Sequence, residues 1–368
     1  MADLTKSGIL NALKKVDDPN FNKNLLILNS IGNFSLSGDK LTVNISLSVP
    51  PSTVNDGLKN KFVNALKNEF SSVKEVNINI ESKVTVHQDS KKTSILPSVK
   101  NTIAIASGKG GVGKSTVAVN IAVALAKDGY SVGLLDADIY GPSIPLMLGI
   151  KDKPNVYQNK ETMQIIPLEN YGLKLISIGF LVDDNAPILW RGPLASGAVK
   201  QFMTDVDWGK LDYMIFDMPP GTGDIQLTLV QTIPLTGAVI VTTPQKVSLI
   251  DARKALKMFT RVNVPVLGIV ENMSYFIAPD TGKKYDIFGT GGGSNLSKEL
   301  DVPFLGGIPI DPQIRIGGDT GKPIIYDIPN AEQAKTIMSI SRKLTEQVNI
   351  RNLNRNSSKV EILLDDKE

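Results

Sequence analysis

Hydrophobic positions change their spacing near residue 100, and the change divides the chain into two parts. Before it, LTKSGILNALKKV and VNDGLKNKFVNALKNEF carry apolar residues at helical spacing, while LTVNISLSV and VKEVNINIES alternate apolar with polar positions. Such alternation is typical of a strand with one buried face. Residues 1–84 are therefore predicted to form a small α+β domain, in the order helix, strands, helix, strand.

From residue 101 the apolar residues gather in short continuous runs. These runs include NTIAIAS, SVGLLDAD, LDYMIFDMPPG, TGAVIVTTP, VPVLGIVENMS and VPFLGGIPI, and helical stretches such as STVAVNIAVALAKDG separate several of them. Strands that are apolar on both faces and alternate with helices indicate an α/β fold, with a mainly parallel sheet covered by helices on both faces. Ligands of such sheets bind at the carboxyl ends of the strands, so the polar residues there are expected to form one site.

Three further stretches set the expected boundaries. Residues 85–100 are polar and lack a clear period, which predicts a linker, and its single histidine, His87, is expected to be solvated. The second domain is expected to span 101–350, with AEQAKTIMSISRKLTEQV as its last helix. Residues 351–368 are predicted to form a polar tail.

Composition removes several classes of protein. The chain of 368 residues has no cysteine, which excludes disulfides, thiol catalysis and thiolate metal sites. The first residues show no charged-then-apolar leader pattern, and no run approaches 18 apolar residues, so no membrane span is expected. The net charge of +3 is too small to argue for a nucleic-acid partner.

The stretch GKGGVGKST fits the phosphate-loop pattern G-x-x-x-x-G-K-[ST] and lies between a predicted strand and a predicted helix. Its glycines let backbone N–H groups point at phosphates, and the helix N-terminus adds favourable partial charge. Lys114 is expected to reach the β- and γ-phosphates, and Ser115 to supply a hydroxyl to Mg²⁺. The candidate nucleotide-binding residues of the loop are Gly108, Lys109, Gly110, Gly111, Val112, Gly113, Lys114, Ser115 and Thr116.

Two further strands end in acidic residues, Asp136 and Asp138 in LLDADIYGPS and Asp217 in MIFDMPPGTGD. Asp136 and Asp217 are candidate Mg²⁺ ligands, partly through water, and Asp138 is a candidate for orienting or deprotonating the attacking water. The alternative for Asp136 and Asp217 is that they cap helices or turns.

The segment after Asp217 is a candidate switch. Gly221 and Gly223 make it flexible, and with Pro220 it is expected to lie beside the γ-phosphate.

A loop of the form K-G-G-x-G-K-[ST], followed by D-A-D and D-x-P-P-G, resembles the deviant Walker A ATPases, which include MinD, ParA and the nitrogenase iron protein. In that class the first lysine crosses a dimer interface to the nucleotide of the other subunit. The resemblance implies that Lys109 makes hydrolysis depend on dimerisation, in the way that an arginine finger does. The alternative is an exposed lysine without a partner.

Longer stretches resemble the Mrp/ApbC family of iron–sulfur cluster carrier ATPases over about 101–348, namely GKGGVGKSTVAVNIAVALAKDGYSVGLLDADIYGPSIP, RGPLASGAVKQF, LDYMIFDMPPGTGDIQLTL, GIVENMSYF and GIPIDPQIRIGGDTGKP. VDDPN at 16–20 resembles the small domain often fused ahead of these ATPases. The resemblance implies that Asn272 hydrogen-bonds adenine and that Pro309 and Asp311 border the base. The alternative for Asn272 is a turn-stabilising side chain.

Members of this family usually carry C-P-x-C-G after ENMSYF, and two such loops in a dimer ligate a bridging [4Fe–4S] cluster. Here the sequence is APDTG, so Ala278 and Thr281 occupy the cysteine positions. Ser52 aligns loosely with a cysteine that some relatives carry in the N-terminal domain. None of these residues can be a thiolate ligand, so direct cluster binding is not expected.

Three hypotheses of function follow. The first is a cytoplasmic, homodimeric, Mg-ATP-dependent ATPase of the Mrp/ApbC type that acts in iron–sulfur cluster assembly or delivery to apo-proteins. The second is a MinD- or ParA-like positioning ATPase on membrane or DNA. The third is a nucleotide-gated adaptor or chaperone for client proteins.

Two observations argue against the second hypothesis. The tail NRNSSKVEILLDDKE ends acidic, unlike a basic membrane-surface helix. The basic residues near 246–261 are more simply a solvated helix face than a DNA-binding patch. No membrane or nucleic-acid partner is therefore expected.

Overall fold

The computed structural model describes residues 4–18, 26–27, 30–88, 94–158, 163–181 and 191–357. The chain forms two compact units, Met1–Val86 with Thr345–Glu368, and His87–Leu344. Part of the VDDPN stretch, part of the predicted linker and the end of the predicted tail lie outside the described residues.

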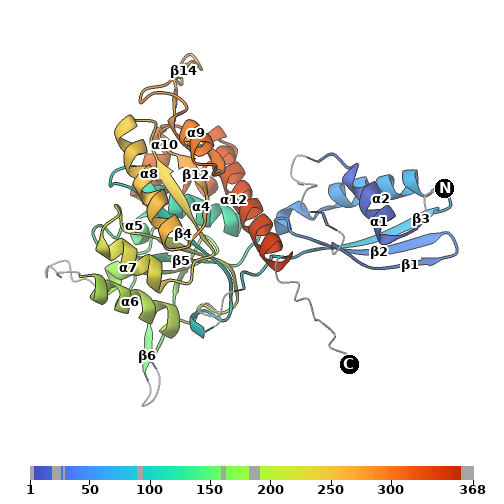
Figure 1. Cartoon of the computed structure of the whole chain (residues 1–368), viewed down its shortest axis with the longest axis horizontal. Helices are drawn as coiled ribbons and strands as arrows, with labels where there is room; N and C mark the ends of the chain where they lie inside the picture. The colour runs from blue at the N-terminus through green and yellow to red at the C-terminus, as the bar shows by residue number, and fades with distance from the viewer. Residues whose placement is uncertain are drawn as a thin grey trace, which may run out of the picture. The chain divides into compact units, whose positions relative to one another are not determined.

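The N-terminal unit contains a three-stranded sheet and two helices (Figure 1). Strand β2 lies in the middle, antiparallel to β1 and parallel to β3. Apolar stripes of both helices pack with one face of the strands into a single core. The predicted α+β order is confirmed. The elements are α1 (Lys6–Lys14), β1 (Ile31–Ser37), β2 (Lys40–Leu47), the 3₁₀ turn η3 (Pro51–Thr53), α2 (Asp56–Glu69) and β3 (Glu75–Ser82).

The larger unit is built on an eight-stranded sheet in the order β15-β12-β11-β4-β10-β5-β9-β8. Every neighbouring pair is parallel except β8 and β9, so the predicted mainly parallel sheet is confirmed. The strands are β4 (Val99–Ser107), β5 (Val132–Asp136), β8 (Leu168–Asn170), β9 (Leu173–Ser177), β10 (Leu211–Asp217), β11 (Gly237–Thr242), β12 (Val266–Glu271) and β15 (Phe304–Gly307).

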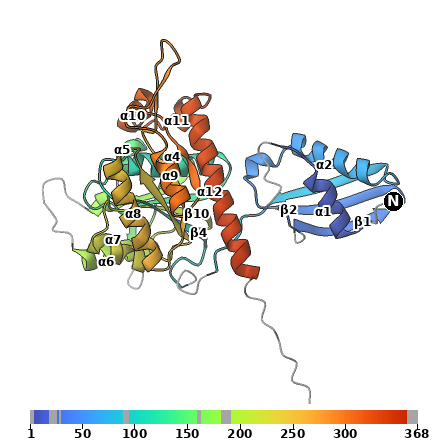
Figure 2. The same ribbon diagram turned by 45° about the horizontal axis from the view of Figure 1, so that its top comes forward.

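Helices cover both faces of this sheet (Figures 1 and 2). Helices α6, α7, α8 and α9 bury apolar residues in one continuous core against the strands, and α4 packs on β4, β5 and β10. The helices are α4 (Lys114–Lys127), α5 (Ile144–Met147), the 3₁₀ turn η4 (Ile178–Leu181), α6 (Gly192–Asp205), α7 (Asp224–Thr232), α8 (Lys246–Arg261), α9 (Gly292–Glu299), α10 (Pro312–Thr320), α11 (Ile324–Asp327) and α12 (Glu332–Ser357), of which the part from Thr345 onward belongs to the first unit.

Two short antiparallel hairpins complete the unit. They are β6 (Val156–Gln158) with β7 (Met163–Ile165), and β13 (Phe276–Ile277) with β14 (Lys284–Tyr285). Among the described residues, no helix combines the length and the hydropathy that crossing a membrane would require.

Two features differ from the sequence pattern. Helix α12 continues to Ser357, because polar residues of its last turns are buried: Asn349 Nδ2 donates to Ser48 O at 2.9 Å, and Thr85 Oγ1 donates to Asn349 Oδ1 at 2.7 Å. The expectation of a solvated His87 was wrong, because its side chain is only 3% exposed. Its backbone N–H donates to Lys100 O, near the start of β4, at 3.1 Å.

Candidate nucleotide-binding site

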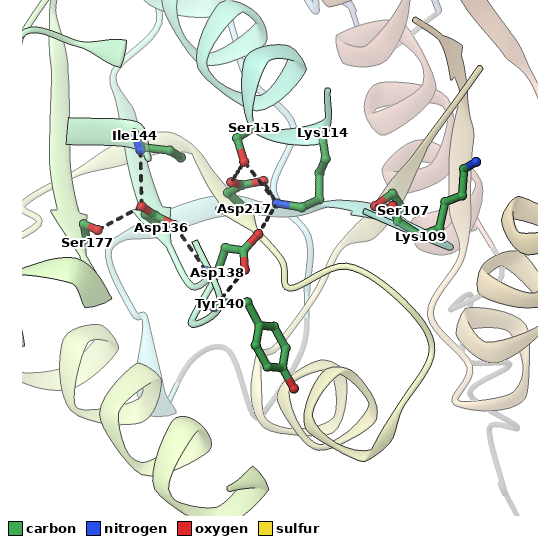
Figure 3. Close-up of polar contacts among 10 residues, drawn as sticks. All are labelled: Ser107, Lys109, Lys114, Ser115, Asp136, Asp138, Tyr140, Ile144, Ser177 and Asp217. Carbon is green, nitrogen blue, oxygen red and sulfur yellow. Dashed lines mark hydrogen bonds and ion pairs between the residues drawn. The ribbon is translucent and has the colours of Figure 1, made fainter. Parts of the chain in front are cut away.

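The phosphate-loop sequence connects β4 to α4 at the carboxyl edge of the large sheet (Figure 3). Strand β10 lies between β4 and β5, and Asp217 at the end of β10 is the register partner of Asp136 at the end of β5. The sheet thus brings the acidic strand ends next to the loop. A cavity of about 230 Å³ opens there, lined by Ser107, Lys109, Gly110, Gly111, Gly113, Lys114, Ser115, Thr116, Asp138, Ser143, Met147 and Pro220.

The loop backbone suits an anion. Gly111 and Gly113 have φ of 80° and 78°, in the left-handed region that glycine adopts without strain. Gly113 is the N-cap of α4, and the first N–H groups of a helix have no intrahelical acceptor. No atom lies within 4 Å of where a Cβ would stand on Gly110 or Gly111. The loop therefore has both the donors and the space that phosphate groups need.

Lys114 is the centre of a buried charged cluster. Its Nζ lies 2.5 Å from Asp217 Oδ1 and 3.2 Å from Asp138 Oδ2, and Ser115 Oγ donates to Asp217 Oδ2 at 2.5 Å. Burial opposes the charge of Lys114, but the carboxylates of Asp217 and Asp138 outweigh it and raise the pKa of the amine. The lysine is therefore cationic at neutral pH.

Burial also opposes the charge of two of the carboxylates, and for an acid this raises the pKa. It raises the pKa of Asp217, which is fully buried, and Lys114 and Ser115 counteract it only in part. Burial and the charge of Asp217 raise the pKa of Asp136 to about 7. A divalent cation would favour the ionised carboxylates. The Ser115 hydroxyl and the Asp217 and Asp138 carboxylates are hard oxygen donors of the kind that Mg²⁺ prefers.

The Asp217 and Asp138 carboxylates face Lys114, whereas the Asp136 carboxylate faces other groups. Its Oδ2 accepts from Ser177 Oγ at 2.8 Å and from the Ile144 N–H at 3.4 Å, and its Oδ1 accepts from the Asp138 N–H at 3.2 Å. Its hydrogen bonds thus join β5, β9 and the start of α5 (Figure 3). Asp138 presents its own carboxylate to Lys114 while also accepting from the Tyr140 N–H.

Lys109 lines the cavity, but its side chain points away from the Lys114 cluster (Figure 3). The Lys109 carbonyl accepts from Ser107 Oγ at 2.8 Å, which fixes the backbone of this residue. Within the described parts of the chain, its amine forms no ion pair. The cluster around Lys114 and the amine of Lys109 are therefore separate positive groups on one loop.

The segment predicted as a switch is joined to the phosphate loop. The Gly221 N–H donates to Ser107 O at 3.0 Å, and Pro220 lines the cavity. Gly221 has φ of 97°, and a Cβ on Gly221 or Gly223 would meet nothing within 4 Å. The loop therefore has room to move.

The structure brings the two segments predicted to border adenine side by side. The Ser274 N–H donates to Ile308 O at 2.9 Å, and the Ile310 N–H donates to Tyr275 O at 2.7 Å. Asn272 Nδ2 donates to Val112 O at 2.9 Å, so this amide supports the phosphate loop. Asp311 is the N-cap of α10. Roles of Asn272, Pro309 and Asp311 in holding a base stay predictions.

Ala278 and Thr281 lie in the turn between β13 and β14, outside the cavity lining. The Ala278 N–H donates to Lys283 O at 3.0 Å, and the Gly282 N–H donates to Ala278 O at 2.8 Å. The described residues contain no group of three or more His, Cys, Asp or Glu side chains that could hold a metal ion.

Sequence reasoning did not single out Ser143 and Met147, which also line the cavity. Both follow Asp138 in the stretch YGPSIPLM, and YGPSIP was already part of the family resemblance. The resemblance could therefore have directed attention to Ser143, whereas Met147 lies two residues beyond that stretch.

Gly108 has a different task from its neighbours. A Cβ there would lie 2.0 Å from the Asp251 carbonyl oxygen on α8, whereas Gly110 faces open space. We expect Gly108→Ala to lower the free energy of unfolding by about 1–3 kcal/mol, because the backbone must move to admit the methyl group. Gly110→Ala is the matched control. Denaturant unfolding of both variants without nucleotide would measure the difference, and equal stabilities would contradict the packing role of Gly108.

Comparison with known families gives two matches. Residues 98–345 match the ParA family described as NUBPL iron-transfer P-loop NTPase, and residues 6–80 match the family described as iron–sulfur cluster assembly protein. Together they cover most of both units.

Individual relatives agree with these matches. The chain is 46% identical over 349 residues to an iron–sulfur cluster carrier protein of Synechocystis, covering 94% of this chain and 99% of the relative. It is 48% identical over 276 residues to the iron–sulfur cluster transfer protein NUBPL of Dictyostelium discoideum, covering 75% and 85%. A solved nucleotide-binding protein of Archaeoglobus fulgidus, in complex with ADP, is 40% identical with a TM-score of 0.56, covering 65% of this chain and 93% of that one.

Proposed function

Because the chain belongs to the ParA family of NUBPL-type iron-transfer P-loop NTPases, we propose that it is a Mg-ATP-dependent, homodimeric ATPase that acts in iron–sulfur cluster delivery to client proteins. The observation that carries the proposal is the convergence of Lys114, Ser115, Asp138 and Asp217 at the carboxyl ends of β4, β5 and β10. The ADP complex of the related Archaeoglobus protein supports the choice of an adenine nucleotide.

The mechanism assigns one task to each group. The loop N–H groups and the Lys114 amine bind the phosphates, and the amine moves to them from Asp217 and Asp138. Ser115 and Asp217 would hold Mg²⁺, which when bound neutralises charge on the phosphates. Asp138, once free of Lys114, accepts a proton from the attacking water or orients it. Asp136 holds the loop that carries Asp138.

Lys109 completes the site from the second subunit in this proposal. Its amine lies apart from the Lys114 cluster of its own chain, which suits a cation that serves another active site (Figure 3). A cation delivered only on assembly stabilises the charge of the transition state and makes hydrolysis depend on dimerisation.

A direct test measures binding of the ATP- and ADP-loaded protein to three kinds of partner: apo iron–sulfur proteins, duplex DNA and anionic liposomes. The proposal expects nucleotide-dependent binding to apo-proteins alone. Binding to DNA or liposomes that depends on ATP would instead support a positioning ATPase. The basic face of α8 favours the first outcome, because Arg253 pairs with Glu299 and Lys254 with Asp251.

In this proposal the iron–sulfur cluster is the species that is transferred, and the residues of this chain are not suited to ligate it. The chain has no cysteine, and the described residues contain no group of three or more His, Asp or Glu side chains that could hold a metal ion instead. Carboxylates and one histidine per chain are poor ligands for sulfide-bridged iron. We infer that a partner supplies the thiolates, and that this chain contributes the nucleotide-driven step.

This inference gives a measurable prediction. Anaerobic reconstitution with iron and sulfide should leave the wild-type protein without a stable cluster, while nucleotide binding persists. The double change Ala278→Cys plus Thr281→Cys should create cluster binding, since the two positions share one hydrogen-bonded turn. Iron content and the absorbance of the reconstituted proteins decide the matter. Uptake of about four iron atoms per wild-type dimer, the content of one [4Fe–4S] cluster, would contradict it.

A further inference from the structure

Gln226 is a buried side chain that the mechanism above does not use. It lies in the first turn of α7 and is 2% exposed. Within the described part of the chain, neither its Oε1 nor its Nε2 has a hydrogen-bond partner. An unpaired buried carboxamide destabilises the conformation that contains it, because both groups have given up hydrogen bonds to water.

The position of Gln226 in its helix suggests where a partner lies. Gly223 is the N-cap of α7, so Gln226 occupies the third helical position. A glutamine there commonly reaches back and accepts from the N–H of the N-cap residue, and helical side chains lean toward the N-terminus. In the described conformation this bond is not made, since Oε1 has no partner.

The loop before α7 can supply the change that makes the bond. It contains Gly221 and Gly223, around which there is open space, and it is joined to the phosphate loop by the hydrogen bond from Gly221 to Ser107. Pro220 lines the same cavity as Lys114. A ligand that fills the cavity would therefore press on this loop, and the displacement would reach Gly223 within three residues.

We propose that Gln226 is a positioning residue for the nucleotide switch, and that it accepts a hydrogen bond from the Gly223 N–H only when nucleotide fills the cavity. The inference rests on the proposed function, because it takes Mg-ATP as the ligand. The unpaired amide raises the free energy of the nucleotide-free conformation. Nucleotide binding is favoured to that extent, since a ligand shifts a conformational equilibrium by its differential affinity for the two states.

The test compares Gln226→Met with Ser341→Ala. Methionine keeps the length of the side chain without its polar atoms. Ser341, on α12, is also fully buried, and its hydroxyl has no hydrogen-bond partner among the residues that the structure describes. Both variants should raise the Tm of the nucleotide-free protein by a few degrees, about 2–4 °C. A non-hydrolysable ATP analogue with Mg²⁺ should then bind Gln226→Met about three- to tenfold more weakly than wild type, and Ser341→Ala as tightly as wild type.

Hydrogen exchange gives a second readout. The analogue should slow exchange in a peptide spanning residues 219–228 of wild type and Ser341→Ala, and do so less in Gln226→Met. Equal affinity and equal protection in all three proteins would reduce Gln226 to a packing residue. A lower Tm of nucleotide-free Gln226→Met would also overturn the proposal, because the amide would then be paired in that state. If the analogue does not bind wild type at all, the proposed function itself fails, and this inference fails with it.

Discussion

Lys114→Ala is expected to lower ATP hydrolysis by about 10²–10³ or more, the loss typical of removing one group that stabilises developing charge. Lys114 is the cation that the loop places next to Asp217 and Asp138, and these groups raise its pKa so that it stays charged. Without it, the negative phosphates would face two carboxylates. Steady-state phosphate release measures the effect, with Lys335→Ala, an exposed lysine of α12, as the control for loss of charge.

The same variant should change the pH dependence of stability. Burial already raises the pKa of Asp217 above its ordinary value, and removing the neighbouring ammonium would raise it further. The folded state then holds a proton that the unfolded state releases, so stability is lost as pH rises from the ordinary aspartate pKa toward the raised one. Lys114→Ala should therefore lose more stability than wild type as pH rises above the ordinary aspartate pKa of about 4. Lys114→Gln, which keeps most of the volume, serves as the second variant.

Full turnover in either variant would remove Lys114 from the active site.

Local patterns were sufficient to predict the phosphate loop and the parallel sheet. A continuous apolar run such as NTIAIAS predicts a strand buried on both faces, whatever its position in the sheet. GKGGVGKST is directly preceded by a strand and directly followed by a helix, so its structural context is also local. The antiparallel pair of β8 and β9 at the sheet edge was not predicted, because the sequence of one strand does not determine which strand it pairs with or in which direction.

Features that depend on long-range contacts could not be derived in this way. The sequence placed Gly108 among the phosphate-binding glycines, and only the fold shows that α8 passes within the reach of a Cβ there. It likewise offered Asp136 as a Mg²⁺ ligand, and only the fold shows that Ser177 on β9 donates a hydrogen bond to the Asp136 carboxylate. Residues two positions apart at a strand end can thus differ in role because the groups that face them come from distant segments.

Lys109→Ala is the second variant with a large expected effect. The Lys109 amine lies apart from the Lys114 cluster, so nucleotide affinity should stay within a few-fold of wild type. Hydrolysis should fall by up to about 10³–10⁵, the range for a cation supplied by a second subunit in related phosphoryl transfer. Nucleotide titration and phosphate release on the same preparation separate binding from turnover. Loss of affinity equal to the loss of turnover would instead place Lys109 among the ordinary binding groups of its own loop.

A mixture of two inactive chains distinguishes action across the dimer from action within one chain. In a heterodimer of Lys109→Ala with Lys114→Ala, the first chain keeps its own Lys114 and can receive Lys109 from the second. One of the two sites is then complete, and with random pairing half of the dimers are mixed, so about a quarter of wild-type activity should return. If Lys109 acts on the nucleotide of its own chain, neither site of the heterodimer is complete and the mixture stays inactive. The double variant Lys109→Ala plus Lys114→Ala is the control, because its dimers cannot form a complete site by either route.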